Sequence, residues 1–222
     1  MKHTETELQE IKKSIAQMWD LVQSQLENAK NALLTSDNDL ARVVRALEKR
    51  VNVFELKIDS DCENYIALFS PVAIDLRLVL SLLTINKTLE RIGDFADGIA
   101  QFVLLSDDKG VHKELLKNLR FEEMVGYVEE MLDKSLNAIT EENSAQAGMV
   151  FSIDDKVDAI YLQAFDLLAK HIVEHPEDAF YALHLITILR KVERSGDHCN
   201  NIMEEIVFYL EAKVLKHQKN KS

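Results

Sequence analysis

Carboxylate side chains recur at helical spacing between Glu90 and Ile99, where the sequence reads ERIGDFADGI. Glu90, Asp94 and Asp97 stand at positions i, i+4 and i+7, so a helix would carry them on one face. Like charges four residues apart destabilise a helix by about 0.2–0.5 kcal/mol, and an internal glycine costs about 1 kcal/mol relative to alanine. A solvated acidic face gives no reason for either cost. A cation site does, because it needs converging oxygens and because glycine lets a neighbouring group approach closely. The pattern therefore favours a cation site, with a solvated acidic face as the alternative.

The same pattern occurs a second time in the chain. Residues 84–99 align without a gap to residues 187–202 and are identical at seven of the sixteen positions. Unrelated sequences would match at about one position, so the chain contains an internal repeat. The alignment pairs Glu90 with Glu193, Asp94 with Asp197, and Asp97 with Asn200. Both helix-destabilising costs are thus incurred twice, which strengthens the case for a cation site.

Oxygen-bearing side chains also stand four residues apart in the segments before each copy. Glu48 and Asn52 in the first segment parallel Asp154 and Asp158 in the second. Carboxylate and amide oxygens are hard ligands, which suit Mg, Ca, Mn or ferric iron better than a zinc site built from soft ligands. No Glu is followed three residues later by His, which argues against a di-iron carboxylate bundle. Each half therefore offers two segments with oxygen ligands for a divalent or trivalent metal ion.

The carboxylate stripe is expected to face away from the core of its own helix. On a helical wheel, apolar residues at 85, 89, 92, 95, 99 and 103 cluster on one side, and Glu90, Asp94 and Asp97 lie roughly opposite. A metal storage or redox bundle would need ligands that face the core, so this arrangement disfavours that main alternative. A metal-free structural interaction protein is the third alternative.

Long amphipathic helices must position these residues. The sequence has only six glycines and two prolines, and apolar residues recur at three- and four-residue steps from Leu8 onward. Turn and capping residues interrupt this periodicity at 35–39, 70–71, 107–110, 141–144 and 175–178. The chain is therefore predicted to be all-α, with six long helices in two tandem, pseudo-symmetric three-helix bundles over residues 1–110 and 111–222.

Charge and motif content disfavour several classes of function. Thirty-eight acidic and 26 basic side chains give a formal net charge of −12, which repels nucleic acid. The apolar runs are too short to span a bilayer and the N-terminus lacks a signal core, so a soluble, cytoplasmic protein is expected. Cys62 and Cys199 lack CxxC spacing and are predicted to be reduced thiols. Motifs for a catalytic nucleophile, a phosphate loop or an HExxH zinc site do not occur, so no enzymatic activity is predicted.

These motifs together make the chain resemble the PhoU family, the accessory regulators of bacterial high-affinity phosphate transport. The resemblance rests on ERxGD at Glu90–Asp94 and again at Glu193–Asp197, and on SPVAIDLRLV at Ser70–Val79. It implies two three-helix bundles with iron or zinc clusters held on the surface by the acidic motifs. It also implies a homodimeric negative regulator of phosphate uptake and of the phosphate-starvation response. Such a regulator acts between the ATPase of the phosphate ABC transporter and a membrane-bound sensor histidine kinase, and reaches the membrane only through these partners.

The resemblance further assigns the candidate metal ligands by position. They are Glu48, Asn52, Glu90, Asp94 and Asp97 in the first half, and Asp154, Asp158, Glu193, Asp197 and Asn200 in the second. Asn52 stands where the motif prefers Asp, and Asn200 stands where the first half has Asp97. A neutral amide offers an oxygen but removes a charge, so the cluster around either residue is expected to be weaker, smaller or empty.

Overall fold

The computed structural model describes residues 2–106 and 113–215, and these two ranges contain helices and no strand. The first range holds α1 (Lys2–Thr35), α2 (Asn38–Phe69) and α3 (Ala73–Leu105). The second holds α4 (Lys113–Asn118), α5 (Phe121–Thr140), α6 (Ala147–Glu174) and α7 (Ala179–Glu211), with short 3-10 turns at Ser144–Gln146 and Pro176–Asp178.

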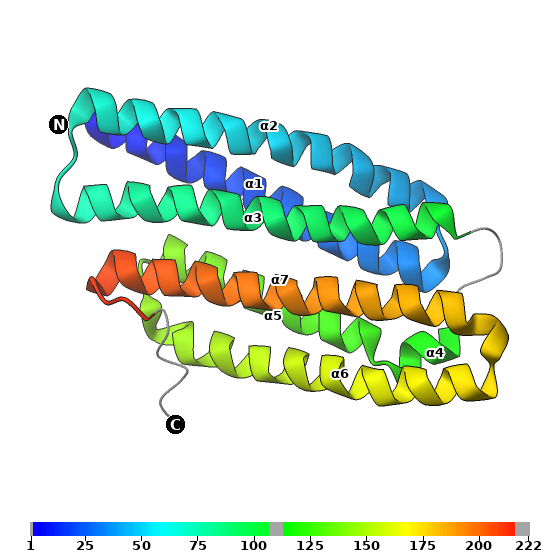
Figure 1. Ribbon diagram of the computed structural model, residues 1–222. Coiled ribbons are helices and arrows are strands. Elements are labelled where there is room, and N and C mark those ends of the chain that lie inside the picture. Colours follow the sequence, from blue (N-terminus) through cyan, green and yellow to red (C-terminus); the bar gives the residue numbers. More distant parts are fainter. Residues whose placement is uncertain (1, 107–112, 216–222) are drawn as a thin grey trace.

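The helices form two bundles that lie side by side (Figure 1). Helices α1, α2 and α3 pack against one another, as do α5, α6 and α7, and the bundles meet where α3 contacts α7 and α1 contacts α5. This arrangement confirms the predicted all-α fold with two tandem three-helix bundles. The predicted division between residues 110 and 111 lies outside the described residues.

The predicted helix ends agree with the structure at four of the interruptions. Asp37 precedes α2, and its carboxylate accepts hydrogen bonds from the backbone N–H groups of Asp39 and Leu40. Ser70 ends α2 in the left-handed region with φ of 45°, directly before Pro71. Asn143 and Pro176 stand at the turns that precede α6 and α7. Local capping and turn chemistry therefore sets these boundaries.

One predicted helix is divided in the structure. A single helix was expected between the predicted interruptions at 107–110 and 141–144. In the structure α4 ends at Asn118 and α5 begins at Phe121. Arg120 adopts the left-handed region with φ of 54°, and its guanidinium donates two hydrogen bonds to the Glu123 carboxylate. Leu119 is buried at the break, so tertiary packing stabilises a turn that no glycine or proline marks.

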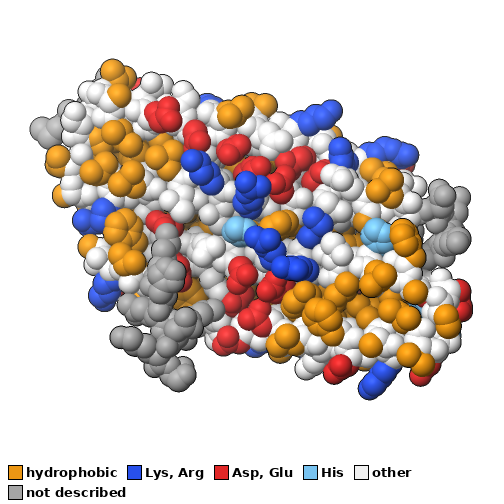
Figure 2. All heavy atoms as spheres, in the orientation of Figure 1, with side chains coloured by type: hydrophobic (Ala, Val, Ile, Leu, Met, Phe, Trp, Pro, Cys, Tyr) orange, Lys and Arg blue, Asp and Glu red, His pale blue; other side chains and the backbone are white. Residues whose placement is uncertain are grey.

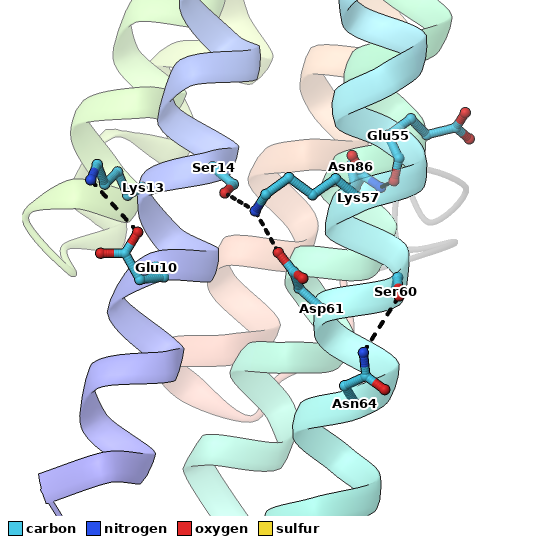
Figure 3. A network of polar contacts seen from close by, with 9 residues as sticks. All are labelled: Glu10, Lys13, Ser14, Glu55, Lys57, Ser60, Asp61, Asn64 and Asn86. Carbon is cyan, nitrogen blue, oxygen red and sulfur yellow. Dashed lines mark hydrogen bonds and ion pairs between the residues drawn. The ribbon is translucent and has the colours of Figure 1, made fainter.

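Polar contacts inside the first bundle tie its three helices together (Figure 3). Lys57 of α2 donates to Ser14 Oγ of α1 at 2.9 Å and pairs with Asp61 at 2.6 Å. Asn86 of α3 is fully buried and donates to the backbone carbonyl of Glu55 on α2 at 2.9 Å. These bonds fix how α2 lies against its two neighbours, and α2 and α3 carry the first set of candidate ligands.

The seam between the bundles has approximate two-fold symmetry. Phe95 of α3 and His198 of α7 occupy equivalent positions of the repeat, and their rings lie 5.5 Å apart. On the other side of the seam, Lys30 of α1 pairs with Glu129 of α5 at 2.7 Å. The contact between equivalent residues brings the two copies of the ERxGD motif next to each other.

Cys62 and Cys199 are buried and free in the structure, and their reduced state stays a prediction. Burial raises the pKa of Cys62 to about 12 and also raises the pKa of Cys199. Across residues 2–106 and 113–215, none of the helices combines the length and the apolar content that crossing a bilayer requires.

Candidate functional site

Two groups of carboxylates flank the seam on one face of the molecule. Figure 2 shows acidic side chains gathered above and below a central band of Arg, Lys and His. The upper group lies over α2 and α3, and the lower group lies over α6 and α7 (Figures 1 and 2). Two sets of carboxylates act on one another through their charges. The first carboxylate cluster comprises Glu48, Glu90, Asp94 and Asp97, and the second comprises Asp154, Asp158, Glu193 and Asp197.

The first cluster brings α2 and α3 side chains close enough to repel one another. Burial, followed by the neighbouring charge of Asp94, raises the pKa of Glu90 to about 7 against the opposing effect of Arg91. Burial likewise raises the pKa of Glu48, and the charges of Asp94 and Asp97 add to this. The repulsion shows that the oxygens of both helices face a common region.

Asn52 lies beside the first carboxylate cluster and, as a neutral amide, adds no charge to it. It is exposed on α2, and its side chain hydrogen-bonds to Glu48, which lowers the pKa of that carboxyl. The structure therefore gives the amide a present role as a donor that orients a carboxylate one helical turn away.

Asp97 departs from the predicted outward stripe. It is only 8% exposed, it pairs with Arg45 of α2 across 3.4 Å, and it accepts a hydrogen bond from Gln101 at 2.7 Å. The helical wheel accounted for the core of a single helix, whereas α2 lies over this part of α3 and covers Asp97. Asp94 remains partly exposed, and its Oδ2 forms an ion pair with Nη1 of Arg91 on the same helix at 3.2 Å.

The second cluster combines one deeply buried carboxylate with more exposed ones. Asp154 of α6 is 1% exposed and accepts a hydrogen bond from the Asn200 side chain of α7. Burial raises the pKa of Glu193, and the charges of Asp197 and Asp158 raise it further. Asp197 itself is exposed. The buried Asp154 and the 6%-exposed Asn200 again contradict a purely outward stripe.

The glycine of each ERxGD motif allows the neighbouring helix to come close. A Cβ atom on Gly93 would lie 2.8 Å from Gln25 Oε1 and 3.3 Å from Glu48 Oε2. A Cβ atom on Gly196 would lie 2.9 Å from Asp154 Oδ1. Such contacts are too short for any side chain without movement of the oxygen, so both glycines serve the close approach expected from the sequence.

Sequence reasoning missed two partners of the first carboxylate cluster. Gln25 of α1 is fully buried and donates to Glu48 Oε2 at 2.9 Å, and Arg45 neutralises Asp97. A signal for Gln25 was present, because it is a polar residue within the apolar stripe of α1 that includes Val22. Arg45 has no comparable signal, since α2 carries many exposed charges.

His198 and Arg194 extend the site toward the seam. Burial lowers the pKa of His198, and the positive charge of Arg194 lowers it further. The Arg194 guanidinium lies 5.5 Å from the centroid of the Phe95 ring on the opposite bundle. This cation–π contact places positive charge between the two acidic clusters.

The ligand chemistry suits a hard cation, although the side chains do not form a closed coordination shell. Within the part of the chain that the structure describes, no three His, Cys, Asp or Glu side chains are arranged to hold a metal ion. Asn200 Oδ1 is buried without a hydrogen-bond partner and is therefore an available oxygen beside Asp154. The oxygen-only donor set fits Mg, Ca, Mn or ferric iron by type, and metal binding stays a prediction.

Comparison with known proteins identifies the family. The PhoU domain model matches residues 15–103 and again residues 121–206. The phosphate-specific transport system accessory protein PhoU of Escherichia coli is 33% identical over 211 residues, covering 95% of this chain and 86% of that protein. The PhoU homolog of Pseudomonas aeruginosa is 31% identical, with the same two coverages.

Two crystal structures share the fold over nearly the whole chain. PhoU from Pseudomonas aeruginosa has a TM-score of 0.84 and 29% identity, covering 94% of this chain and 99% of that one. The phosphate transport system regulatory protein PhoU from Streptococcus pneumoniae has a TM-score of 0.82 and 25% identity, with coverages of 96% and 99%. The duplicated ERxGD helices, the two bundles and these matches lead to one conclusion: the chain belongs to the PhoU family.

Proposed function

We propose that this chain is a regulatory accessory protein of a phosphate ABC transporter. The observation that carries the proposal is the double match of the PhoU domain, together with relatives that are named accessory proteins of phosphate-specific transport. In phosphate-replete cells, the protein would damp phosphate uptake and keep the phosphate-starvation response off. Its partners would be the ATPase of the transporter and the sensor histidine kinase.

A docking role agrees with the build of the molecule. The two carboxylate clusters and the intervening cations lie on one face, and they are carried by long helices that the bundle cores hold in place (Figure 2). A rigid helical face of alternating charge suits recognition of a partner by electrostatic complementarity. Catalysis is not part of the proposed role.

Each carboxylate cluster is further proposed to bind metal. Glu48, Glu90 and Asp94 would supply oxygens in the first half, and Asp158, Glu193 and Asp197 in the second. Iron or zinc is expected from the family resemblance, and Mg, Ca or Mn from the ligand chemistry. A bound cation would relieve the repulsion that raises the pKa of Glu90 and Glu193, and would change the sign of the local charge presented to a partner.

Metal content tests this part of the proposal. Protein prepared without a chelating tag would be analysed by mass spectrometry of its metals, alongside Glu90→Ala/Asp94→Ala and Glu193→Ala/Asp197→Ala. Each double variant should lose part of the metal and bind the purified ATPase or kinase more weakly. Loss of metal with unchanged partner binding would contradict a role of the metal in docking.

The regulatory role is tested in cells at high phosphate. A reporter of phosphate-starvation genes would be compared in wild-type cells, in a strain without this protein and in a complemented strain. Reporter output should rise on deletion and return on complementation. Output that does not change on deletion would contradict the proposed function.

A homodimer is proposed from the family resemblance, with a cytoplasmic location and with contact to the inner membrane only through partners. Sedimentation of the purified chain should give about twice the mass of 25.4 kDa. A monomer over the whole concentration range would contradict the dimer.

A further inference from the structure

The arginine that follows the glutamate of each ERxGD motif has different partners in the two bundles. Arg91 pairs with two carboxylates of its own helix, with Asp94 across 3.2 Å and with Glu90 across 3.6 Å. The equivalent Arg194 lies against the opposite bundle instead, with its guanidinium 5.5 Å from the centroid of the Phe95 ring. In the described part of the chain, Arg194 forms no ion pair with a carboxylate. The first carboxylate cluster therefore contains a cation of the protein's own, and the second does not contain the equivalent one.

The spacing along α7 would allow Arg194 the same ion pairs. Glu193 and Asp197 stand one residue before it and three residues after it, at the offsets that the two partners of Arg91 have. Residues three apart on a helix are close neighbours. Arg194 is exposed, so its side chain has room to turn toward them. Because the local geometry is equal in the two bundles, the difference comes from across the seam.

The ring that faces each arginine across the seam is different. Arg194 meets the face of the Phe95 ring, which attracts a cation, and Lys191 Nζ lies 5.8 Å from the centroid of the same ring. The equivalent ring is the imidazole of His198. Burial lowers the pKa of His198, and the charges of Arg194 and Arg91 lower it further. An imidazole has polar nitrogens and can itself take up a proton, so it attracts Arg91 less than a phenyl ring would.

The second cluster borders an open pocket of about 350 Å³, whose lining includes Asp197, Asn200 and Arg194. Asn200 is 6% exposed, and its Oδ1 has no hydrogen-bond partner. An amide oxygen next to carboxylates suits a hard cation. A guanidinium that turned into this pocket would compete with such a cation, and the contact with Phe95 keeps it at the seam.

The cations nearest to the second cluster along α6 and α7 are Lys156, Arg190, Lys191 and Arg194. Arg190 opposes the rise in the pKa of Glu193 that burial and the neighbouring carboxylates cause. Lys156 lies over an aromatic ring of α5, and the last two lie over Phe95. Figure 2 shows cationic side chains gathered between the two acidic groups. The Phe95 ring thus holds two of the four cations at the seam.

We propose that Phe95 is a positioning residue for the cation site of the opposite bundle. By holding Arg194 at the seam, the ring keeps a competing positive charge out of the second carboxylate cluster. Without the ring, Arg194 would turn to Glu193 and Asp197, as Arg91 turns to its own two carboxylates. This inference rests on the proposed metal binding, and it adds that a residue of one bundle sets the cation affinity of the other.

The test measures Mn²⁺ binding to each cluster alone, by calorimetry of metal-stripped protein at low ionic strength. Glu90→Ala/Asp94→Ala leaves the second cluster, and Glu193→Ala/Asp197→Ala leaves the first. Phe95→Leu is then added to both backgrounds. It should weaken Mn²⁺ binding to the second cluster by about threefold to tenfold, because one unit charge would move next to a divalent cation near the surface. Binding to the first cluster should not change.

Three further variants separate positioning from general loosening of the seam. Phe95→Tyr keeps an aromatic ring and should leave the affinity of the second cluster unchanged. Phe102→Leu is the matched control, because this ring of α3 also meets α7, at Tyr181 and His184, and its loss should have no effect. Arg194→Gln, added to Phe95→Leu, should restore the affinity. Circular dichroism would verify that all variants fold.

Equal Mn²⁺ affinity of the second cluster with and without Phe95→Leu would overturn the inference and leave the proposed metal binding intact. So would a loss that persists with Arg194→Gln, or an equal loss in Phe102→Leu, because neither would act through the guanidinium. If neither cluster binds Mn²⁺ with Phe95 in place, the proposed metal binding fails and this inference fails with it. The reporter test of the regulatory role is independent of all these outcomes.

Discussion

In each bundle, an amide side chain donates a hydrogen bond to the carboxylate that lies beside the glycine of the ERxGD motif. The amide comes from a different helix in each bundle. In the first bundle, Gln25 of α1 donates to Glu48. In the second bundle, Met131 is the α5 neighbour of the glycine, as Gln25 is the α1 neighbour in the first. Its sulfur lies 3.9 Å from the Cβ position of Gly196 and cannot donate a hydrogen bond. The donor there is Asn200 of α7, which bonds to Asp154. The carboxylate beside the glycine thus has an amide donor in both bundles, and the donor lies on α1 in the first bundle and on α7 in the second.

A second exchange accompanies the first. Asp97 pairs with Arg45 in the first bundle. The carboxylates align α2 with α6 at a shift of 106 positions, and the ERxGD motifs align α3 with α7 at a shift of 103. At these shifts, Asn200 stands in the place of Asp97 and Phe151 stands in the place of Arg45. The positions of the Asp97–Arg45 ion pair are thus occupied in the second bundle by an amide and an aromatic residue. Asn200 is explained first as the partner of a buried carboxylate, and its effect on a metal site is secondary.

The largest effect is expected from Asn200→Asp, which replaces the amide donor of the second bundle by a carboxylate. Two carboxylates would face each other at a site where Asp154 is 1% exposed, so the free energy of unfolding should fall by about 3 kcal/mol near pH 7. Mutual repulsion raises the pKa of the pair in the folded state, so the loss should shrink as the pH falls and one carboxyl takes up a proton. Urea unfolding in EDTA measures this loss.

Asp97→Asn is the matched control in the first bundle. It removes one partner of an ion pair whose Arg45 side chain is 47% exposed, so the loss should stay below about 1 kcal/mol. Equal losses in the two variants would show that the bundles do not differ in the way described.

The two kinds of glycine contact predict opposite outcomes for alanine. Gly196→Ala would press a methyl group against Asp154 Oδ1, 2.9 Å away, and should cost about 1–2 kcal/mol despite the better helix propensity. At Gly98 the nearest atom is Lys191 Nζ, which ends a flexible side chain and can move. Gly98→Ala should therefore be neutral or stabilise by up to about 1 kcal/mol. Thermal unfolding of the two variants tests the contrast, and a loss at both positions would contradict it.

Replacement of Gln25 by Met would give the first bundle the side chain of the second. Glu48 would lose its 2.9 Å hydrogen bond, and the free energy of unfolding should fall by about 1 kcal/mol near pH 7. Adding Asp97→Asn should restore part of this loss, because the new amide would take the role that Asn200 has in the second bundle. A double-mutant cycle measured by urea unfolding gives the coupling; strictly additive losses would argue against an exchange of donors.

The smallest expected effect is a pH-dependent gain from Glu90→Gln. The folded-state pKa of Glu90 is about 7, above the ordinary value of 4.5, so its ionisation disfavours folding. The penalty is absent below pH 4.5, grows as the pH rises and is complete above pH 7. Without metal, Glu90→Gln should stabilise the protein by less than about 1 kcal/mol at pH 8 and not at pH 4.5. A stability difference that does not vary with pH would contradict the raised pKa.

The sequence predicted those features that depend on neighbours along the chain. Asp37, Ser70 and Pro176 mark helix boundaries through local hydrogen bonds and backbone restrictions, and the repeat revealed the paired carboxylates through their spacing. The break at Leu119 was missed because buried packing produces it without a turn residue. Gln25 and Arg45 were missed as partners of the first carboxylate cluster, because Glu48 and Asp97 lie 23 and 52 positions away from them on other helices.

The central claim, that this chain damps phosphate uptake, is tested most directly by uptake of radiolabelled phosphate in phosphate-replete cells. Uptake would be measured in the wild type, in a strain lacking the chain and in that strain complemented with it. The account predicts faster uptake without the chain and a return to the wild-type rate on complementation. An uptake rate that stays the same in all three strains would contradict it.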